Sequence, residues 1–320
     1  MAIKLTNHPV LCNYYVTYRC NASCSFCDIW EKPSPYISFE QVEANLIALK
    51  KLKVRVIDFT GGEPLLHREL GDFLALAKKL KFITTVTTNA LLYPKRAEEL
   101  KGKVDMLHFS LDSFDRDTHN ASRKVVCYDH VMESIDIAKS LGERPDILFT
   151  VTPNNLHEIE ALQAFCVSKS LVLILNPMFD YQVLNTDSMF TEEQLKQLSD
   201  YGKRKNVFLN EGFITLRKNG GNKIEDPVCF AGEDTVVISP FNELVLPCYH
   251  LGLEKFKIDN DLEQLWKSEP VVAMRNLAGK APECASCTIN CYMQPSFSTH
   301  VNQYFWKSLP STSKYNYLKG

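Results

Sequence analysis

Residues 10–27, VLCNYYVTYRCNASCSFC, join an apolar run typical of a buried strand to a loop that holds three cysteines. Cys20, Cys24 and Cys27 lie within eight positions of one another. Three thiolates on one short loop can hold a metal cluster but do not complete it, since structural zinc sites and [4Fe–4S] clusters normally take four protein ligands. The spacing therefore predicts a metal site with one coordination position left for a group that is not protein.

The same spacing, i, i+4 and i+7, would also place three small cysteines on one face of a buried helix. That alternative is disfavoured because Arg19, Asn21, Ser23 and Ser25 make a poor helix between a strand and a proline-containing stretch. We therefore interpret the segment as a metal-binding loop.

The composition is that of an ordinary globular protein of 320 residues, with 45% hydrophobic residues, 23% charged residues and a formal net charge of −2. This balance gives no indication of nucleic-acid binding. The sequence has neither a signal-peptide pattern nor an apolar run long enough to span a bilayer, so we expect a cytoplasmic protein without a transmembrane segment. Eleven cysteines in a reducing compartment indicate metal binding or catalysis rather than disulfides.

Short apolar runs alternate with segments of helical periodicity through the first 177 residues, which predicts an α/β fold with a parallel sheet. Polar residues, glycine and proline follow every run, at the end of parallel strands where ligands bind. The six expected strands are Val10–Thr17, Val54–Phe59, Phe82–Thr87, Val104–Phe109, Ile147–Val151 and Val172–Leu175. The expected helices between them are Ser38–Lys51, Glu69–Leu80, Lys95–Leu100, Tyr128–Ser140 and Leu156–Lys169.

Two motifs together resemble the radical S-adenosylmethionine (radical SAM) superfamily. The first is Cys20-x3-Cys24-x2-Cys27 with Phe26 before the last cysteine, and the second is Gly61-Gly62-Glu63-Pro64 after the second expected strand. The resemblance covers about residues 10–180. It implies a partial (β/α)6 TIM-type barrel.

The resemblance also implies roles for individual residues. The three cysteines would ligate a [4Fe–4S] cluster whose open iron chelates S-adenosylmethionine (SAM), which is reductively cleaved to a 5′-deoxyadenosyl radical that abstracts hydrogen from a substrate. Phe26 would lie near the adenine, and Gly61-Gly62-Glu63-Pro64 would receive the methionine ammonium. Ser110 and Asp112 resemble residues that hold the ribose or the carboxylate of SAM. Weaker candidates, on position alone, are Thr88, Asn89 and Asn154.

A second group of cysteines follows Lys218–Asn222, where a break between two regions is expected, and resembles an auxiliary-cluster domain of the Twitch or SPASM type. It comprises Cys229, Cys248, Cys284, Cys287 and Cys291, around a hairpin expected at Thr235–Ile238 and Leu244–Leu246. Five cysteines favour one auxiliary [4Fe–4S] cluster, for which the first four are the preferred ligands, and Cys291 is either a spare or a substitute for one of them. A structural zinc site is the alternative for this group, because paired cysteines at such spacing also suit zinc.

These expectations divide the chain into a radical SAM core (1–215), an auxiliary-cluster domain (216–292) and a C-terminal tail without clear periodicity (293–320) that docks onto the barrel. The implied activity is hydrogen abstraction from a peptide or small metabolite, supported by a reductant such as flavodoxin or ferredoxin; no residue is identified as a catalytic acid or base. Two other classes remain open: a non-catalytic iron–sulfur electron carrier or scaffold, and a zinc-stabilised binding module.

Overall fold

The computed structural model describes residues 3–179, 189–259 and 261–320, and its main feature is a curved ten-stranded sheet. The strand order is β11-β10-β9-β2-β3-β4-β5-β6-β7-β8. Strands β2 to β8 are parallel, and each pairs with the next along the chain. The strands are β2 (Leu11–Thr17), β3 (Val56–Gly61), β4 (Ile83–Thr88), β5 (Met106–Ser110), β6 (Asp146–Val151), β7 (Val172–Pro177) and β8 (Val207–Phe208).

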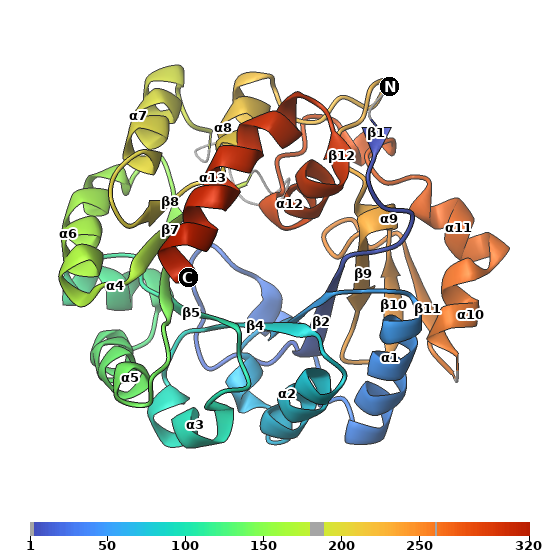
Figure 1. Ribbon diagram of the computed structural model, residues 1–320, viewed down its shortest axis with the longest axis horizontal. Coiled ribbons are helices and arrows are strands. Elements are labelled where there is room, and N and C mark those ends of the chain that lie inside the picture. Colours follow the sequence, from blue (N-terminus) through green and yellow to red (C-terminus); the bar gives the residue numbers. More distant parts are fainter. Residues whose placement is uncertain (1–2, 180–188, 260) are drawn as a thin grey trace.

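Helices cover the outer side of this sheet, as Figure 1 shows. The six expected strands and the intervening helices are confirmed, and the two-residue strand β8 extends the parallel part by one strand. The structure also has a short helix, α4, that the sequence pattern did not indicate. The helices are α1 (Phe39–Lys51), α2 (Leu70–Lys79), α3 (Tyr93–Leu100), α4 (Arg116–Arg123), α5 (Tyr128–Ser140), α6 (Ile159–Lys169), α7 (Glu192–Gly202) and α8 (Glu211–Lys218).

The alternation of side chains along each strand separates an apolar outer layer from a polar inner one. On β3, Ile57 and Phe59 are fully buried in the main core, against helix residues such as Leu46. Asp58 points to the opposite, inner face, where it accepts a hydrogen bond from Thr85 on β4. Apolar packing between the strands and the outer helices therefore stabilises the barrel, and polar side chains such as Asp58 and Thr85 lie on its inner face.

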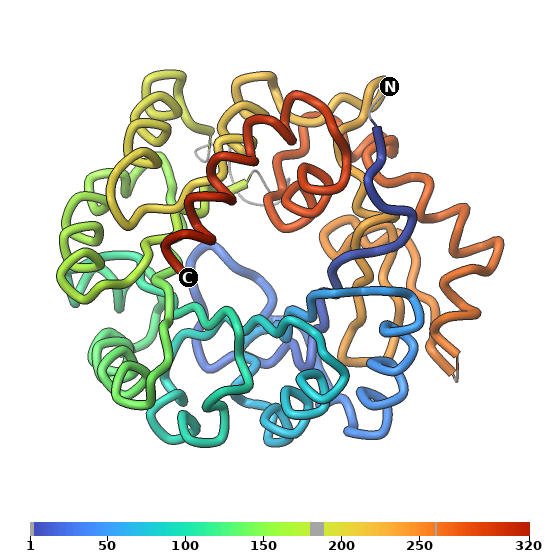
Figure 2. Tube along the Cα trace, in the orientation of Figure 1, coloured from blue at the N-terminus to red at the C-terminus, as the bar shows by residue number. Residues whose placement is uncertain are grey.

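The expected hairpin joins the same sheet. Strand β9 (Thr235–Ile238) pairs in parallel with β2, and β10 (Glu243–Leu246) and β11 (Glu254–Lys257) continue the sheet in antiparallel fashion. In Figure 2 these orange segments lie beside the blue N-terminal strand. The expected boundary after residue 215 falls inside α8, and the division into domains stays a prediction.

The C-terminal segment is helical, which corrects the expectation of a tail without regular structure. It forms α12 (Asn290–Thr299) and α13 (Gln303–Lys319), with the two-residue strand β12 (His300–Val301) between them. Helix α13 packs on α8 and reaches the start of β6, where the Tyr315 hydroxyl donates to the Asp146 carboxylate over 2.6 Å. Docking of this segment onto the barrel is thus confirmed.

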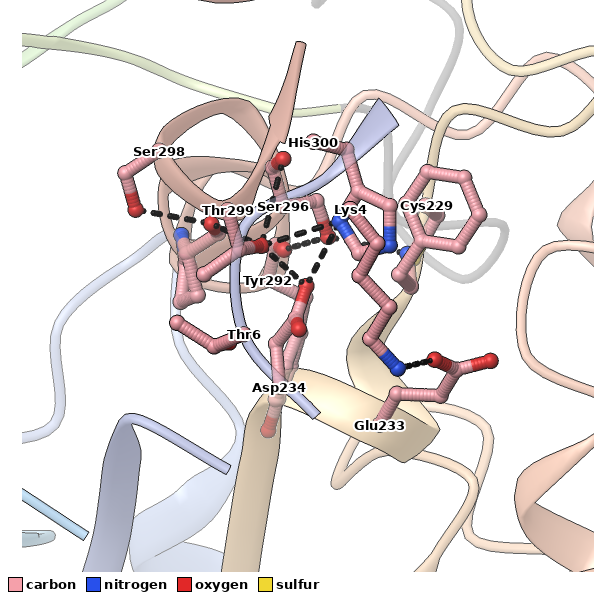
Figure 3. A network of polar contacts seen from close by, with 12 residues as sticks. Lys4, Thr6, Cys229, Glu233, Asp234, Tyr292, Ser296, Ser298, Thr299 and His300 are labelled. Atoms are coloured by element: carbon pink, nitrogen blue, oxygen red, sulfur yellow. Dashed lines mark hydrogen bonds and ion pairs between the residues drawn. The ribbon is translucent and has the colours of Figure 1, made fainter. Parts of the chain in front are cut away.

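A buried polar network fastens α12 to the start of the hairpin and is drawn in Figure 3. The Thr299 hydroxyl lies 2.8 Å from an Asp234 carboxylate oxygen, and the His300 ring lies 3.5 Å from the same oxygen. Phe230 stacks on His300 with ring centroids 3.7 Å apart. Lys4 of β1 (Ile3–Lys4) forms an ion pair with Glu233 at the edge of the network. These contacts hold residues 230–234, just before β9, against the end of α12 and against β1.

No helix within the described ranges is both long enough and apolar enough to cross a membrane.

Candidate cluster-binding sites

The three N-terminal cysteines lie on the loop that follows β2, at the carboxyl end of the sheet. All three are partly exposed, and the backbone turns tightly between Cys24 and Cys27, whose N–H donates to the Cys24 carbonyl over 3.2 Å. Burial raises the pKa of Cys20 to about 12, and the nearby Glu63, Cys24 and Cys27 add to the rise. The Cys20 thiol therefore tends to keep its proton. A metal that binds these cysteines would have to displace the thiol protons, so metal binding would compete with protonation.

The side chains of Cys20, Cys24 and Cys27 are not grouped in the geometry of metal ligands. In the portion of the chain that the structure describes, no group of three or more His, Cys, Asp or Glu side chains has the arrangement of a metal site. Ligation of a cluster by Cys20, Cys24 and Cys27 therefore stays a prediction, which rests on their shared loop and on the chemistry of their thiols.

Gly61 and Gly62 allow the end of β3 to pass directly against the end of β2. A Cβ atom on Gly61 would lie 2.0 Å from the Thr17 carbonyl oxygen, and one on Gly62 would lie 2.4 Å from the Arg19 carbonyl oxygen. The N–H groups of Gly62 and Glu63 donate to these same two carbonyls. The glycines are thus required by the chain's own backbone, and their expected approach to the SAM ammonium stays a prediction.

Glu63 is 1% exposed and its carboxylate links the ends of β3 and β4. Oε1 accepts from the Leu65 N–H over 3.0 Å and from the Thr88 hydroxyl over 2.8 Å, while Oε2 accepts from the Asn89 N–H over 2.9 Å. The Asn89 side-chain amide in turn donates to Asn21, between Cys20 and Cys24, over 2.8 Å. The sequence-predicted residues Glu63, Thr88 and Asn89 are therefore brought together and connected to the cysteine loop.

Asp112 forms a buried ion pair with Arg123, a residue that the sequence motifs did not indicate. The Asp112 and Arg123 side chains are 3% and 9% exposed, and Arg123 Nε lies 2.7 Å from Asp112 Oδ2. The Arg123 guanidinium also lies over the Phe26 ring, 5.2 Å from its centroid, and 3.9 Å from the Cys24 sulfur. Helix α4 thereby places a fixed positive charge against the cysteine loop.

The remaining predicted residues of this site differ in exposure. Ser110 is buried at the end of β5, and Pro64 is buried in the turn after β3. Asn154 is exposed after β6, where its N–H donates to Thr152. Asn154 is therefore the least connected of the candidates.

The second cysteine group surrounds a pocket. Cys229, Cys248, Cys284 and Cys287, the four preferred ligands, all line it, together with apolar residues such as Met293. Burial raises the pKa of Cys248 to about 12 and that of Cys287 to about 11, and nearby cysteines add to both shifts. Cys291 does not line this pocket and is exposed in the first turn of α12. The structure thus separates the fifth cysteine from the other four.

One aromatic cluster packs between the two cysteine groups. Tyr15 of β2 stacks on Tyr249, which follows Cys248, with ring centroids 4.3 Å apart. Tyr15 also contacts Tyr18, near the N-terminal loop, with centroids 5.7 Å apart. Cys27 and Cys248 are both packed against this cluster. The two cysteine groups are consequently neighbours across a continuous apolar contact.

Cys12, Cys127 and Cys166 are fully buried, as expected for small apolar residues. Cys127 additionally lies 3.2 Å from the Nε2 atom of His119, behind the Asp112–Arg123 pair. None of the three is part of the two cysteine groups.

Comparison with known protein families gives a match to the radical SAM superfamily over residues 14–166. These residues form a radical SAM domain. The matched residues begin within β2 and end within α6, and they include the cysteine loop, the glycine motif and the Asp112–Arg123 pair. The family implies a SAM ligand and a [4Fe–4S] cluster.

Curated relatives match part of the chain. A protein named probable GTP 3′,8-cyclase, from Methanocella arvoryzae, is 29% identical over 58% of this chain and 63% of its own length. The chain thus matches less than two thirds of that relative.

Solved structures resemble the radical SAM domain and the region after it. SuiB from Streptococcus suis, solved with the precursor peptide SuiA, has a TM-score of 0.70 and 20% identity, over 91% of this chain and 71% of SuiB. The protein anSMEcpe, solved with bound AdoMet, has a TM-score of 0.65 and 17% identity, over 97% of this chain and 93% of its own. At this identity the likeness shows the fold alone, which is that of a partial TIM barrel.

Proposed function

We propose that this protein is a radical SAM enzyme that removes a hydrogen atom from a peptide or a small metabolite. The observation that carries the proposal is the hydrogen-bonded connection of the ends of β3 and β4 to one three-cysteine loop inside a radical SAM domain. When bound, a [4Fe–4S] cluster with SAM supplies reductive cleavage and hydrogen abstraction, so the protein itself has to bind, orient and exclude water.

The residues around the loop fit these tasks. Cys20, Cys24 and Cys27 would hold the cluster through three thiolates and leave one iron open. Glu63 and Asn89 fix the loop relative to β3 and β4, which limits its freedom before any ligand binds. Arg123 adds a buried positive charge that favours the anionic thiolates and the carboxylate of SAM.

The pocket of Cys229, Cys248, Cys284 and Cys287 would hold an auxiliary [4Fe–4S] cluster. Four cysteines around one small apolar pocket supply the four thiolates that such a cluster takes. The same four thiols could bind zinc, which is the second candidate for this pocket. Its nearness to the N-terminal loop favours a cluster that either passes an electron or positions the substrate.

Substrate and partners are proposed on less direct grounds. The polar inner face of the barrel, with Asp58 and Thr85, favours a substrate that can form hydrogen bonds. The likeness to SuiB, whose structure contains a precursor peptide, makes a peptide substrate worth testing first. A flavodoxin or ferredoxin would deliver the electron, and we propose a cytoplasmic location because the sites need reduced thiols.

The test is anaerobic reconstitution with iron and sulfide, followed by addition of SAM and dithionite. The enzyme proposal expects 5′-deoxyadenosine from the wild type and none from a Cys24→Ala variant, with Cys166→Ala as the matched control that keeps activity. Clusters without 5′-deoxyadenosine would instead support an electron carrier or scaffold. Zinc uptake without iron uptake would support a zinc-stabilised binding module.

A further inference from the structure

We propose that Asn222 is a positioning residue that fixes three of the four pocket cysteines relative to one another, as ligation of the auxiliary cluster requires. The inference rests on the proposed auxiliary cluster and concerns a segment, Lys218–Asn222, that the sequence suggests is only a break between regions.

The Asn222 side chain is 1% exposed and uses both ends of its amide. Nδ2 donates to the carbonyl oxygens of Gly279 over 2.8 Å and Cys284 over 3.1 Å. Oδ1 accepts from the N–H groups of Val228 over 2.9 Å and Cys229 over 3.3 Å. One side chain thereby bonds the backbone at Cys229 to the backbone at Cys284.

The Asn222 backbone adds the third cysteine. Its N–H donates to the Cys287 carbonyl over 3.0 Å, and its carbonyl accepts from the Ser286 N–H over 2.8 Å. Cys248 lies outside these bonds and is held separately, with its sulfur accepting from the Leu251 N–H over 3.4 Å. Asn222 therefore connects the segments that carry three ligands, while the fourth comes from the end of the hairpin.

Two glycines make room for this arrangement. A Cβ atom on Gly221, whose φ is +82°, would lie 2.2 Å from the Ser286 carbonyl oxygen. A Cβ atom on Gly279, whose φ is +75°, would lie 2.6 Å from the Cys229 carbonyl oxygen. Each glycine permits a close backbone approach beside a predicted ligand, so the Asn222 contacts depend on both.

Only an amide side chain satisfies all four partners. Aspartate of the same shape offers oxygens alone, so the carboxylate oxygen in the place of Nδ2 would face the carbonyl oxygens of Gly279 and Cys284 with no hydrogen between them. A buried acceptor left without a donor is costly. Asn222→Asp should therefore loosen the segment of Cys284 and Cys287 relative to that of Cys229.

The experiment uses the full chain with Cys20, Cys24 and Cys27 replaced by alanine. These replacements remove the N-terminal ligands, so that any cluster bound is the one in the pocket. This parent is reconstituted anaerobically, and Asn222→Asp is compared with Asn45→Asp. Asn45 is a matched control, because it is buried and its Nδ2 also donates twice, to Tyr14 and Asn242, neither of which lines the pocket. Far-UV circular dichroism establishes that both variants are folded.

Two measurements decide the proposal. Asn222→Asp should release iron to a chelator at least about tenfold faster than the parent and should change the electron paramagnetic resonance spectrum of the reduced cluster. Asn45→Asp should do neither, although it removes a similar number of buried hydrogen bonds. If Asn222→Asp proves unfolded, Asn222→Ser, which keeps a small polar group, takes its place.

The outcomes separate this inference from the function on which it rests. If the parent binds no iron–sulfur cluster, the auxiliary-cluster proposal fails, and the role of Asn222 fails with it. If the parent binds a cluster and the Asn222 variant retains iron and spectrum like the Asn45 variant, only the positioning role is overturned.

Discussion

Replacement of Arg123 by methionine tests the account of the N-terminal site most directly. The change removes a guanidinium that pairs with Asp112 at 2.7 Å in a buried position and leaves a carboxylate without its cation. Removing one partner of a buried pair costs about 3–5 kcal/mol. The bonds that remain to Asp112 are long, at 3.2 Å from the Ser122 hydroxyl and 3.4 Å from the Thr150 N–H, and return about 1 kcal/mol.

We therefore expect Arg123→Met to lower the free energy of unfolding by about 3 kcal/mol. The measurement is urea denaturation of the reduced, metal-free protein, with linear extrapolation to water. Arg116→Met is the matched control, because Arg116 and Asp129 also lie 2.7 Å apart but are 59% and 58% exposed. That exposed pair should contribute less than about 1 kcal/mol.

A double variant adds a second check on the same reasoning. Arg123→Met leaves the buried Asp112 carboxylate without a cation, and Asp112→Asn removes that negative charge. The double variant should therefore recover at least about 1 kcal/mol of the free energy of unfolding relative to Arg123→Met alone. A loss no larger than that of Arg116→Met, or no recovery in the double variant, would show that the pair is not a buried charge pair and would refute the argument.

Three further predictions concern other parts of the fold. Gly62→Ala should destabilise the protein by at least about 2 kcal/mol in urea, because its Cβ would lie 2.4 Å from the Arg19 carbonyl oxygen. Burial raises the pKa of Asp58 to about 6, so the folded state binds a proton that the unfolded chain has lost, and stability falls as pH rises from about 4 to 6. Asp58→Asn should gain stability relative to wild type over that interval and hold a constant difference above it. Tyr315→Phe should lower thermal stability by about 2 kcal/mol through the lost bond to Asp146, and an unchanged melting temperature would contradict this.

The barrel was predictable because its strands are apolar runs bounded by polar turns, and because the helices between them are amphipathic. Helix α5 has the expected bounds, Tyr128–Ser140, and α1 begins after its cap, Ser38, where the first helix was expected to start. In both cases the local pattern and the tertiary packing favour the same structure, so the sequence alone suffices.

The C-terminal helices were not predictable in this way. Helix α12 contains Pro295 and α13 contains Pro310, and neither has a regular apolar stripe that would indicate a helix. Tertiary contacts such as those of Thr299 with Asp234 stabilise them instead. Local propensity is a weak guide where packing decides.

The cysteines and glycines of the candidate sites could be identified from their spacing in the sequence. The residues that contact and position them could not. Arg123 and Asn222 act through partners that are distant in sequence or through backbone groups, which no spacing rule encodes. The one available signal for Asn222 is the Gly220-Gly221 pair before it, which marks a close backbone approach as readily as a break.

The pairing of β9 with β2 has a consequence for any attempt to shorten this chain. Without residues 235–238, the N–H and C=O groups of β2 that now bond to β9 would form a free sheet edge, and such edges promote aggregation by recruiting strands from other molecules. The cysteine-rich region thus also shields the barrel, and a fragment that stops before it would be expected to self-associate rather than remain monomeric.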